Sequence, residues 1–373
     1  MPQPLRYGSY HTYRVDSSDK VSAATCVRTY DGWVPLGSYG YGTYEDYARN
    51  GCNGHNNFGR HSKEDLDIHA LLAMRAVMIL GDRPPDDYMV GHPGVFAYCP
   101  QDEPDVGDYF EAKHLPMGQR VGYLAMEMER RCQMYRETDP QTMTILTIDL
   151  TFKPANFYIY APICDFVNPD CYPLSLGADA KMVYEVVKTV RYAAGPRPVT
   201  FTFQSCYEEP YDEQQRAKMR FPRPPFAGEV RLMMLYAIAA GARGLFGYGH
   251  HTEKTANYLH RGSGEFPDVW HAIGRTYREL EHIAPLLALS HPTDIAKTGD
   301  EKVLVSTLVA GEKALLLVII NEDYTQEANA FRVKPKSVSV EVPKLPWLVP
   351  RFAWKVTEQG FERLLLFSSG EKA

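Results

Sequence analysis

Two adjacent carboxylates, Asp102 and Glu103, directly follow an apolar run in the segment GVFAYCPQDEP. Neighbouring carboxylates disfavour double ionisation, and burial behind an apolar segment raises a carboxyl pKa because it disfavours the charged form. A carboxyl group that keeps its proton near neutral pH can act as a general acid. The pair therefore predicts acid–base chemistry with Glu103 as proton donor. The alternative is that Asp102 caps the following loop while Glu103 forms a salt bridge.

Other carboxylates also follow apolar runs. Asp149 ends the run TMTILTID, Asp170 lies in NPDCYP, and Glu208 and Glu209 come after TFTFQSCY. Each of them is a candidate for the second carboxylate that would work with the acid. Two alternatives stay open, because Asp170 could cap a turn and Glu209 could be a solvated side chain of the acidic run EEPYDE.

These candidates need a scaffold that brings the ends of several apolar segments together. From about residue 33 to residue 285, short apolar runs alternate with amphipathic segments, which is the pattern of repeated βα units. Eight units can be placed, and they predict a (β/α)8 barrel, or TIM barrel, in which the C-terminal ends of the strands meet at one face. The expected strands lie at 34–40, 52–58, 76–82, 94–104, 142–149, 163–173, 198–210 and 241–251.

The pattern of expected helices and strands changes towards the C-terminal end of the sequence. A Ser-initiated helix from Ser62, with acidic residues in its first turn, is typical of the helices expected between the strands. After Pro292 the chain instead shows the short strand-like runs KVLVSTLVAG, EKALLLVIINE, KSVSVEVPKL and ERLLLFSSG. We therefore expect two domains: a barrel with a short N-terminal extension over residues 1–290, and a β-sandwich-like domain over residues 291–373.

Three segments carry a resemblance to a known group of enzymes. HPGVFAYCPQDEPD, DFVNPDCYP and GEVRLMMLYAIAAGARGLFGYG occur in this order, and the region from 33 to 285 resembles the clan A glycoside hydrolases. The resemblance implies that Glu103, at the end of the fourth strand, is the general acid and base, and that a Glu at the end of the seventh strand is the nucleophile. Gln204 occupies that second position here, and Asp102 stands where the clan has Asn, with an implied contact to the sugar 2-hydroxyl.

An amide cannot be the nucleophile, so three interpretations follow. Glu208 or Glu209 supplies the carboxylate, Asp149 or Asp170 supplies it from a neighbouring strand, or the barrel binds sugar without cleaving it. The spacing of the two carboxyl groups would separate retaining from inverting hydrolysis. We favour cleavage of O-glycosidic bonds in an oligo- or polysaccharide, with Glu103, Glu209 and Asp170 as catalytic candidates. The residues expected to bind the substrate are Asp102, Tyr39, Asn57, Tyr98, Asp149, Tyr172, Gln204 and His250.

The composition limits the classes of molecule that the protein is expected to bind. The net charge is −6 and no run of Lys or Arg forms a phosphate-binding stripe, so we expect no nucleic acid and a neutral, polar substrate. The resemblance to glycoside hydrolases implies that this substrate is a carbohydrate; a homo-oligomer is compatible with the sequence. Apolar runs are too short to cross a membrane. The first residues lack a signal-peptide pattern, so we expect a soluble protein, secreted or periplasmic if a signal has been removed and otherwise cytoplasmic.

No cofactor is expected. The chain has neither a GxGxxG fingerprint nor a phosphate-binding loop, and it lacks the GxSxG motif of serine hydrolases. Its seven cysteines are spread out without a CxxC pair, which argues against a disulfide framework or a zinc site. A metal-dependent hydrolase using His55, His61 and Asp82 is the remaining alternative, although a lone His in a loop more often only forms hydrogen bonds.

Overall fold

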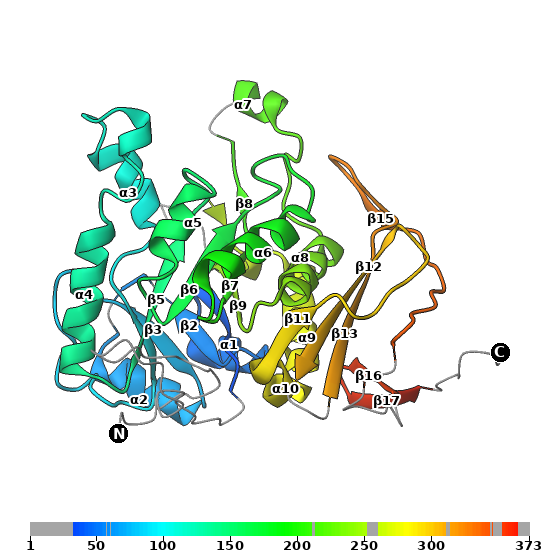
Figure 1. Ribbon diagram of the computed structural model, residues 1–373, viewed down its shortest axis with the longest axis horizontal. Coiled ribbons are helices and arrows are strands. Elements are labelled where there is room, and N and C mark those ends of the chain that lie inside the picture. The colour runs from blue at the N-terminus through cyan, green and yellow to red at the C-terminus, as the bar shows by residue number, and fades with distance from the viewer. Residues whose placement is uncertain are drawn as a thin grey trace.

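Eight parallel strands form a closed barrel in the order β1-β2-β3-β4-β5-β6-β7-β9 (Figure 1). The computed structural model describes residues 33–56, 58–59, 61–210, 213–251, 260–310, 314–343, 345 and 353–364. Each expected strand is found in its expected place, which confirms the predicted (β/α)8 fold. The strands are β1 Leu36–Tyr41, β2 Gly54–Asn56, β3 Arg75–Ile79, β4 Val95–Cys99, β5 Met143–Ile148, β6 Phe166–Cys171, β7 Phe201–Gln204 and β9 Leu245–His251.

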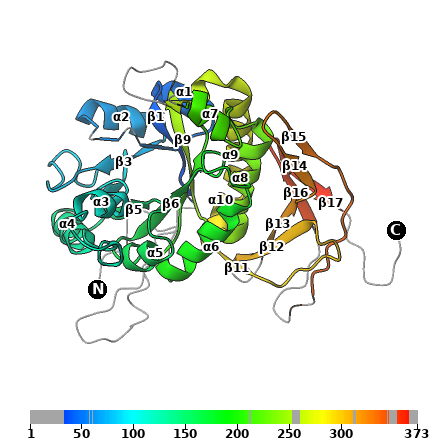
Figure 2. The ribbon, with the colours of Figure 1, turned by 90° about the horizontal axis from the view of Figure 1, so that it is seen from above.

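Helices surround the barrel, as Figure 2 shows from above. The sequence signals at their ends act as expected: Ser62 forms a capping box with Asp65 at the start of α2, and Gly241 ends α8 in a left-handed conformation. The helices are α1 Tyr44–Arg49, α2 Lys63–Leu71, α3 Pro104–Glu111, α4 Ala125–Thr138, α5 Ala155–Tyr160, α6 Met182–Ala194, α7 Glu213–Lys218, α8 Ala227–Ala240, α9 Pro267–His282 and α10 Ala284–Leu289.

Side chains alternate between the barrel interior and the helix layer along each strand. On β5, Ile145 belongs to the interior cluster, whereas Leu146 and Ile148 belong to the cluster under the helices. On β6, Phe166 lies inside and Val167 outside. This period of two decides which polar residues near the strand ends face the mouth of the barrel.

The C-terminal part consists of small antiparallel sheets beside the barrel (Figure 2). The predicted runs KVLVSTLVAG and EKALLLVIINE form β12 and β13, and ERLLLFSSG is described only as far as Leu364. The described residues of the run KSVSVEVPKL form isolated bridges and no strand; one of these bridges joins Glu341 to Lys297. The sheets are β11 Ser290–Thr293 with β12 Val303–Ala310 and β13 Ala314–Asn321, β14 Tyr324–Gln326 with β15 Phe331–Val333, and β16 Ala353–Thr357 with β17 Gly360–Leu364.

One core joins these sheets to the barrel helices. Leu308 and Ile320 belong to the same buried cluster as the apolar face of α8, and Ser306 Oγ donates to Ala239 O over 2.6 Å. Glu229, fully buried in α8, accepts from Arg223 and from Gln326 Nε2 of β14. The division into two domains at residue 290 stays a prediction.

Two further expectations concern the whole chain. The six cysteines in the described part are buried and free, as expected for a protein without a disulfide framework. None of the helices within the described ranges is long and apolar enough to cross a membrane.

Candidate functional site

Three carboxylates from neighbouring strands meet at the C-terminal mouth of the barrel. Glu103 follows β4, Asp149 follows β5, and Asp170 lies near the end of β6. An oxygen from each lies within 4.8 Å of the others. Asp149 and Asp170 reach this place because they continue the inward-facing series of their strands.

The backbone at Glu103 is held in an unusual conformation. Its φ of 46° and ψ of 61° are left-handed, which for a residue other than Gly costs about 1–3 kcal/mol. Pro104 then begins α3, and the Glu103 side chain makes no capping hydrogen bond to that helix. No ion pair among the described residues involves Glu103, so the salt bridge considered from the sequence is not found within them. The side chain is instead directed to the other carboxylates.

Burial raises the pKa of Glu103 and Asp170 in this cluster, and of the neighbouring Asp102. For Glu103, burial is the main cause; a hydrogen bond with Asp170 opposes it, and the charges of Asp149 and Glu208 add to it. Burial also raises the pKa of Asp170 far above its ordinary value, followed by the charge of Glu103. For Asp102, burial and then the charge of Glu103 raise the pKa to about 7, against a lowering hydrogen bond from Thr147. The mouth therefore holds protons near neutral pH.

A buried polar layer lies directly beneath the carboxylates. The Tyr39 hydroxyl and Thr147 Oγ1 are 3.1 Å apart, and Asn168 Nδ2 donates to Tyr39 Oη over 3.1 Å and to Thr202 Oγ1 over 2.8 Å. Thr200 Oγ1 donates to Asn168 Oδ1 over 2.9 Å. This network fixes Tyr39 and Thr147 next to Asp102. Sequence reasoning missed Thr147 and Asn168, although polar residues at inward positions of apolar strands were the available signal.

Two aromatic rings stand beside Asp170. The rings of Tyr172 and Tyr248 are stacked, with centroids 5.1 Å apart and planes at 21°, and Tyr172 Oη donates to Asp170 Oδ2 over 3.1 Å. Tyr248, on β9, was not among the predicted binding residues. Together the rings give the carboxylate cluster an aromatic side.

Asp105 supports Asp149 from below. Its carboxylate accepts from the Asp149 backbone N–H over 3.1 Å and from Asn156 Nδ2 over 2.8 Å. Burial raises the pKa of Asp105 to about 8, although both hydrogen bonds lower it. Its place, fully buried in the first turn of α3, gave no functional signal in the sequence.

The Gln204 side chain forms hydrogen bonds that hold a neighbouring loop and is not part of the carboxylate cluster at the mouth of the barrel. Its Oε1 accepts from the Leu174 backbone N–H over 3.0 Å, and its Nε2 donates to Ser175 Oγ over 2.9 Å and to Cys206 O over 3.3 Å. The amide therefore anchors the loop after β6, and its hydrogen-bonding capacity is used within the protein.

Glu209 does not join the cluster. Its carboxylate lies 3.7 Å from Arg261 Nε, and it lines a shallow pocket of about 470 Å³ with Tyr207 and Arg216. Its neighbour Glu208 is the residue of this segment whose charge acts on Glu103. The structure thus brings Asp170, and not Glu209, to Glu103.

Two predicted binding residues lie away from the mouth and are corrected here. Tyr98 is fully buried outside the barrel and donates to Asp139 Oδ2 over 3.0 Å, because Ala97 and Cys99 take the inward positions of β4. His250 is also fully buried; its ring stacks on Trp270, and its nitrogens face Ser263 and Asp46. Asn57 lies outside the described residues.

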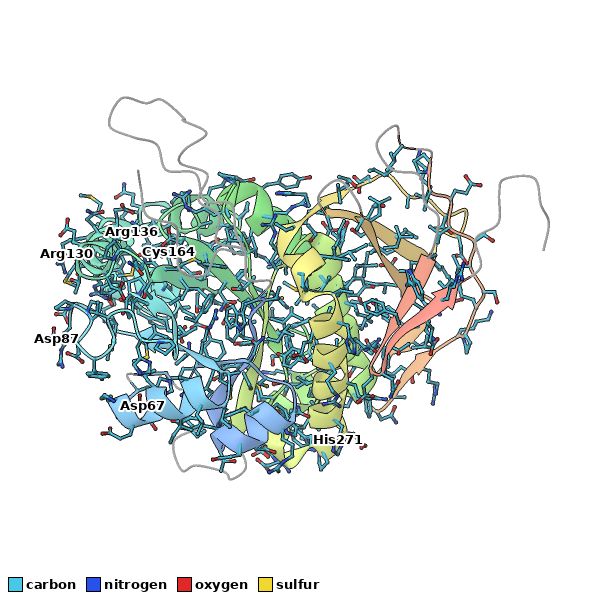
Figure 3. All side chains as sticks on the ribbon, turned by 90° about the horizontal axis from the view of Figure 1, so that it is seen from below. Asp67, Asp87, Arg130, Arg136, Cys164 and His271 are labelled. Atoms are coloured by element: carbon cyan, nitrogen blue, oxygen red, sulfur yellow. The ribbon has the colours of Figure 1, made fainter. Side chains whose placement is uncertain are left out.

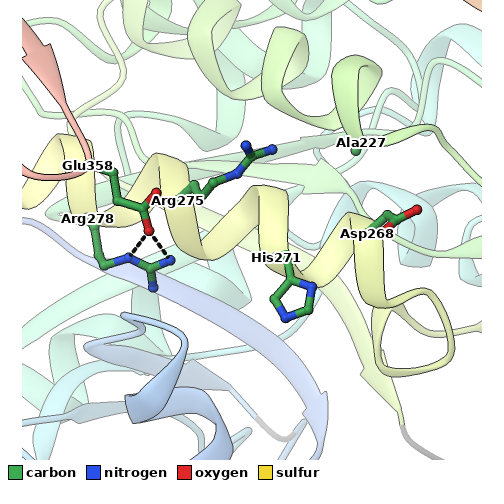
Figure 4. A pocket seen from close by; sticks show the side chains of 6 residues that line it. All are labelled: Ala227, Asp268, His271, Arg275, Arg278 and Glu358. Atoms are coloured by element: carbon green, nitrogen blue, oxygen red, sulfur yellow. Dashed lines mark hydrogen bonds and ion pairs between the residues drawn. The ribbon is translucent and has the colours of Figure 1, made fainter.

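A separate surface pocket of about 510 Å³ lies along α9 (Figure 4). It is lined by charged side chains, and Arg278 closes one end through a hydrogen bond of 2.8 Å from its Nε to Glu358. No member of the carboxylate cluster lines it. The mouth of the barrel is therefore the candidate active site.

Comparison with known proteins supports the fold. No family model and no curated protein sequence matches the chain. Among solved structures, a β-galactosidase from the Antarctic haloarchaeon Halorubrum lacusprofundi matches with a TM-score of 0.50 and 12% identity over 68% of this chain and 62% of its own.

Two further matches have lower TM-scores. A β-glucuronidase of Bacteroides uniformis has a TM-score of 0.43 and 12% identity over 74% of this chain and 39% of its own. An endo-β-1,4-mannanase of Thermotoga petrophila has a TM-score of 0.44 and 11% identity over 74% of this chain and 84% of its own. The chain thus spans less than two thirds of the first two proteins. At 12% identity, the match to the β-galactosidase is a likeness of fold alone.

Proposed function

We propose that this protein is a glycoside hydrolase in which Glu103 is the general acid and base and Asp170 is the nucleophile. The observation that carries the proposal is the contact between these two carboxyl groups at the C-terminal mouth of the barrel, where catalytic groups of this fold sit. Function does not follow from the fold, so the proposal rests on the chemistry of this pair.

One proton shared by the pair gives the two roles. Burial raises both pKa values; the charge and hydrogen bond of Glu103 raise the pKa of Asp170 further, whereas the hydrogen bond with Asp170 lowers that of Glu103, so the pair titrates in two separated steps. The shared proton lies on Asp170 in the substrate-free protein, and the assigned roles require it to pass to Glu103 when the sugar binds. Between these steps one group is a protonated acid and the other a carboxylate. General acid catalysis needs the first and nucleophilic attack the second.

The spacing favours a retaining mechanism. Retaining enzymes hold their two carboxyl groups about 5–5.5 Å apart, whereas inverting enzymes leave about 6.5–9.5 Å for a water molecule. One oxygen of Glu103 and one of Asp170 lie within 4.8 Å of each other, which is nearer to the retaining spacing than to the inverting one. Asp170 would therefore attack the anomeric carbon, and Glu103 would protonate the leaving oxygen and then activate water.

The surrounding residues fit a sugar substrate. The Tyr172 and Tyr248 rings offer apolar faces beside Asp170. Among the described residues, the buried Asp102 Oδ1 has no hydrogen-bond partner, as an oxygen awaiting a substrate hydroxyl would have none. Asp149 adds a further acceptor at the same place. These groups would orient hydroxyls around the reacting bond.

A carbohydrate-binding barrel without turnover is the second candidate. It is favoured by Gln204, whose amide is fully engaged in the loop after β6 and leaves the end of β7 without a carboxylate. In that case Glu103 and Asp170 would only accept hydrogen bonds from the sugar.

Hydrolysis of a panel of aryl α- and β-glycosides tests the proposal. We expect turnover by the wild-type protein that falls at least about 10²-fold in Glu103→Gln and Asp170→Asn. Glu213→Gln, in the exposed helix α7, controls for loss of an acidic charge. Loss of activity in Glu209→Gln but not in Asp170→Asn would move the nucleophile to the loop after β7. Sugar binding without turnover would identify the binding barrel.

A further inference from the structure

Three buried histidines gather on the outer side of the barrel, away from the carboxylates. His55 lies in β2, His69 in α2, and His61 just before the Ser62 cap of that helix. A ring nitrogen from each lies within 4.8 Å of the others, and the side chains are at most 2% exposed. Asp82, considered with His55 and His61 from the sequence, is not part of this group, and His69 takes its place.

The hydrogen bonds of His55 and His69 need three N–H groups, but two neutral imidazole rings carry only two. His55 Nε2 faces Gly40 O at 3.1 Å, His69 Nδ1 faces Asp65 O at 2.7 Å, and His55 Nδ1 faces His69 Nε2 at 3.2 Å. A carbonyl oxygen only accepts, so each outer nitrogen must carry the N–H of its ring. The two inner nitrogens are then left as lone pairs that face each other, and a cation must lie between them.

We propose that these histidines bind a divalent transition-metal ion, Zn²⁺, which bridges their inner nitrogens. Two imidazoles bound to zinc at about 2.0–2.1 Å with tetrahedral angles have nitrogens about 3.3 Å apart, close to the 3.2 Å between His55 and His69. A shared proton would need only two rings. A metal ion can take a third ligand, and a ring nitrogen of His61 lies within 4.8 Å of the nitrogens of the other two rings.

The surroundings match those of a histidine-bound metal. Ligating histidines almost always donate their second N–H to a carbonyl or carboxylate, as His55 and His69 do to backbone carbonyls. The Asp65 carboxylate, held by Ser62 and by Tyr44 Oη, places a negative charge near His61 that offsets the charge of the ion.

The neighbouring side chains give the site a structural role. The rings of Tyr44 and Tyr47 cover it, with centroids 4.4 Å from His69 and 4.7 Å from His55. The ion would link β2 to α2 in a part of the barrel that does not touch the carboxylate cluster. We therefore expect zinc to support stability and not to take part in the reaction.

Metal analysis and thermal unfolding of the full chain test this site. We expect about one zinc ion per chain, a Tm lowered by several degrees after removal with a chelator, and recovery on addition of Zn²⁺. Replacement of zinc by Co²⁺ should give the visible absorption of a tetrahedral nitrogen site. His61→Ala should lose the ion, whereas His271→Ala, at an exposed position of α9 (Figure 3), should retain it.

The measurements on the wild-type protein stay informative if His61→Ala does not fold. No stoichiometric uptake of Zn²⁺ or Co²⁺, together with a Tm unchanged by chelator, would overturn the proposal. Equal loss of zinc in His61→Ala and His271→Ala would also overturn it, because binding would then not depend on the buried cluster.

Discussion

Replacement of Asp102 by Asn should stabilise the protein at alkaline pH and not in acid. Burial and the charge of Glu103 raise the pKa of Asp102 from 3.8 to about 7. A raised carboxyl pKa means that the folded state prefers the protonated form, so its stabilising effect is complete below pH 4 and is lost as the pH rises through 7. Since one pKa unit corresponds to about 1.36 kcal/mol, the full loss is about 4 kcal/mol above pH 8.

The accessible part of this change lies between pH 5 and pH 8.5. Over this range the wild-type protein should lose about 2–3 kcal/mol through Asp102, and Asp102→Asn should not. Urea unfolding at both pH values, followed by tryptophan fluorescence, measures the difference. Asp87→Asn, which changes an exposed aspartate (Figure 3), is the matched control. An equal gain from Asp102→Asn at both pH values would refute the claim that this carboxyl group is desolvated.

Three further predictions follow from the contacts of single residues. Hydrolysis of an active glycoside should release the sugar with retained anomeric configuration, visible by proton NMR before mutarotation; inversion would contradict the short Glu103–Asp170 spacing. Gln204→Glu should lower the free energy of unfolding by about 1–3 kcal/mol and gain no activity, because a carboxylate cannot donate to Cys206 O; a more active and equally stable variant would argue against this reasoning. Glu229→Ala should cost about 3–5 kcal/mol in urea unfolding, since it leaves the partly buried Arg223 guanidinium without its carboxylate partner, and a change below about 1 kcal/mol would show that the contact is unimportant.

The barrel could be predicted from the sequence because each βα unit carries local signals. Apolar runs of strand length, the Ser62 cap and the glycine that ends α8 are readable without knowledge of the rest of the chain. KSVSVEVPKL shows where such signals fail. Its alternating valines suit a strand, but a strand also needs a neighbouring strand, and the described residues of this run form isolated bridges only.

The site could be predicted in part. Glu103, Asp149 and Asp170 were found because strand ends meet in a barrel. Tyr98 was misplaced because its side is set by the phase of the alternation on β4, which a run of consecutive apolar residues does not reveal.

Contacts between segments that are distant in the chain could not be predicted from the sequence. The attachment of Gln204 to the loop at Leu174 and the separation of Glu209 from Glu103 depend on how loops fold over the mouth. The same is true of His69, whose meeting with His55 depends on the packing of α2 against β2.

The dependence of hydrolysis on the leaving group tests the central claim most directly. A general acid is needed for poor leaving groups and not for good ones, whereas a nucleophile is needed for both. Glu103→Gln should therefore cleave dinitrophenyl glycosides within about tenfold of the wild-type rate and alkyl glycosides about 10²–10⁴-fold more slowly, while Asp170→Asn should lose both. Equal losses for both leaving groups in Glu103→Gln, or wild-type rates in Asp170→Asn, would contradict the assignment of these two carboxylates.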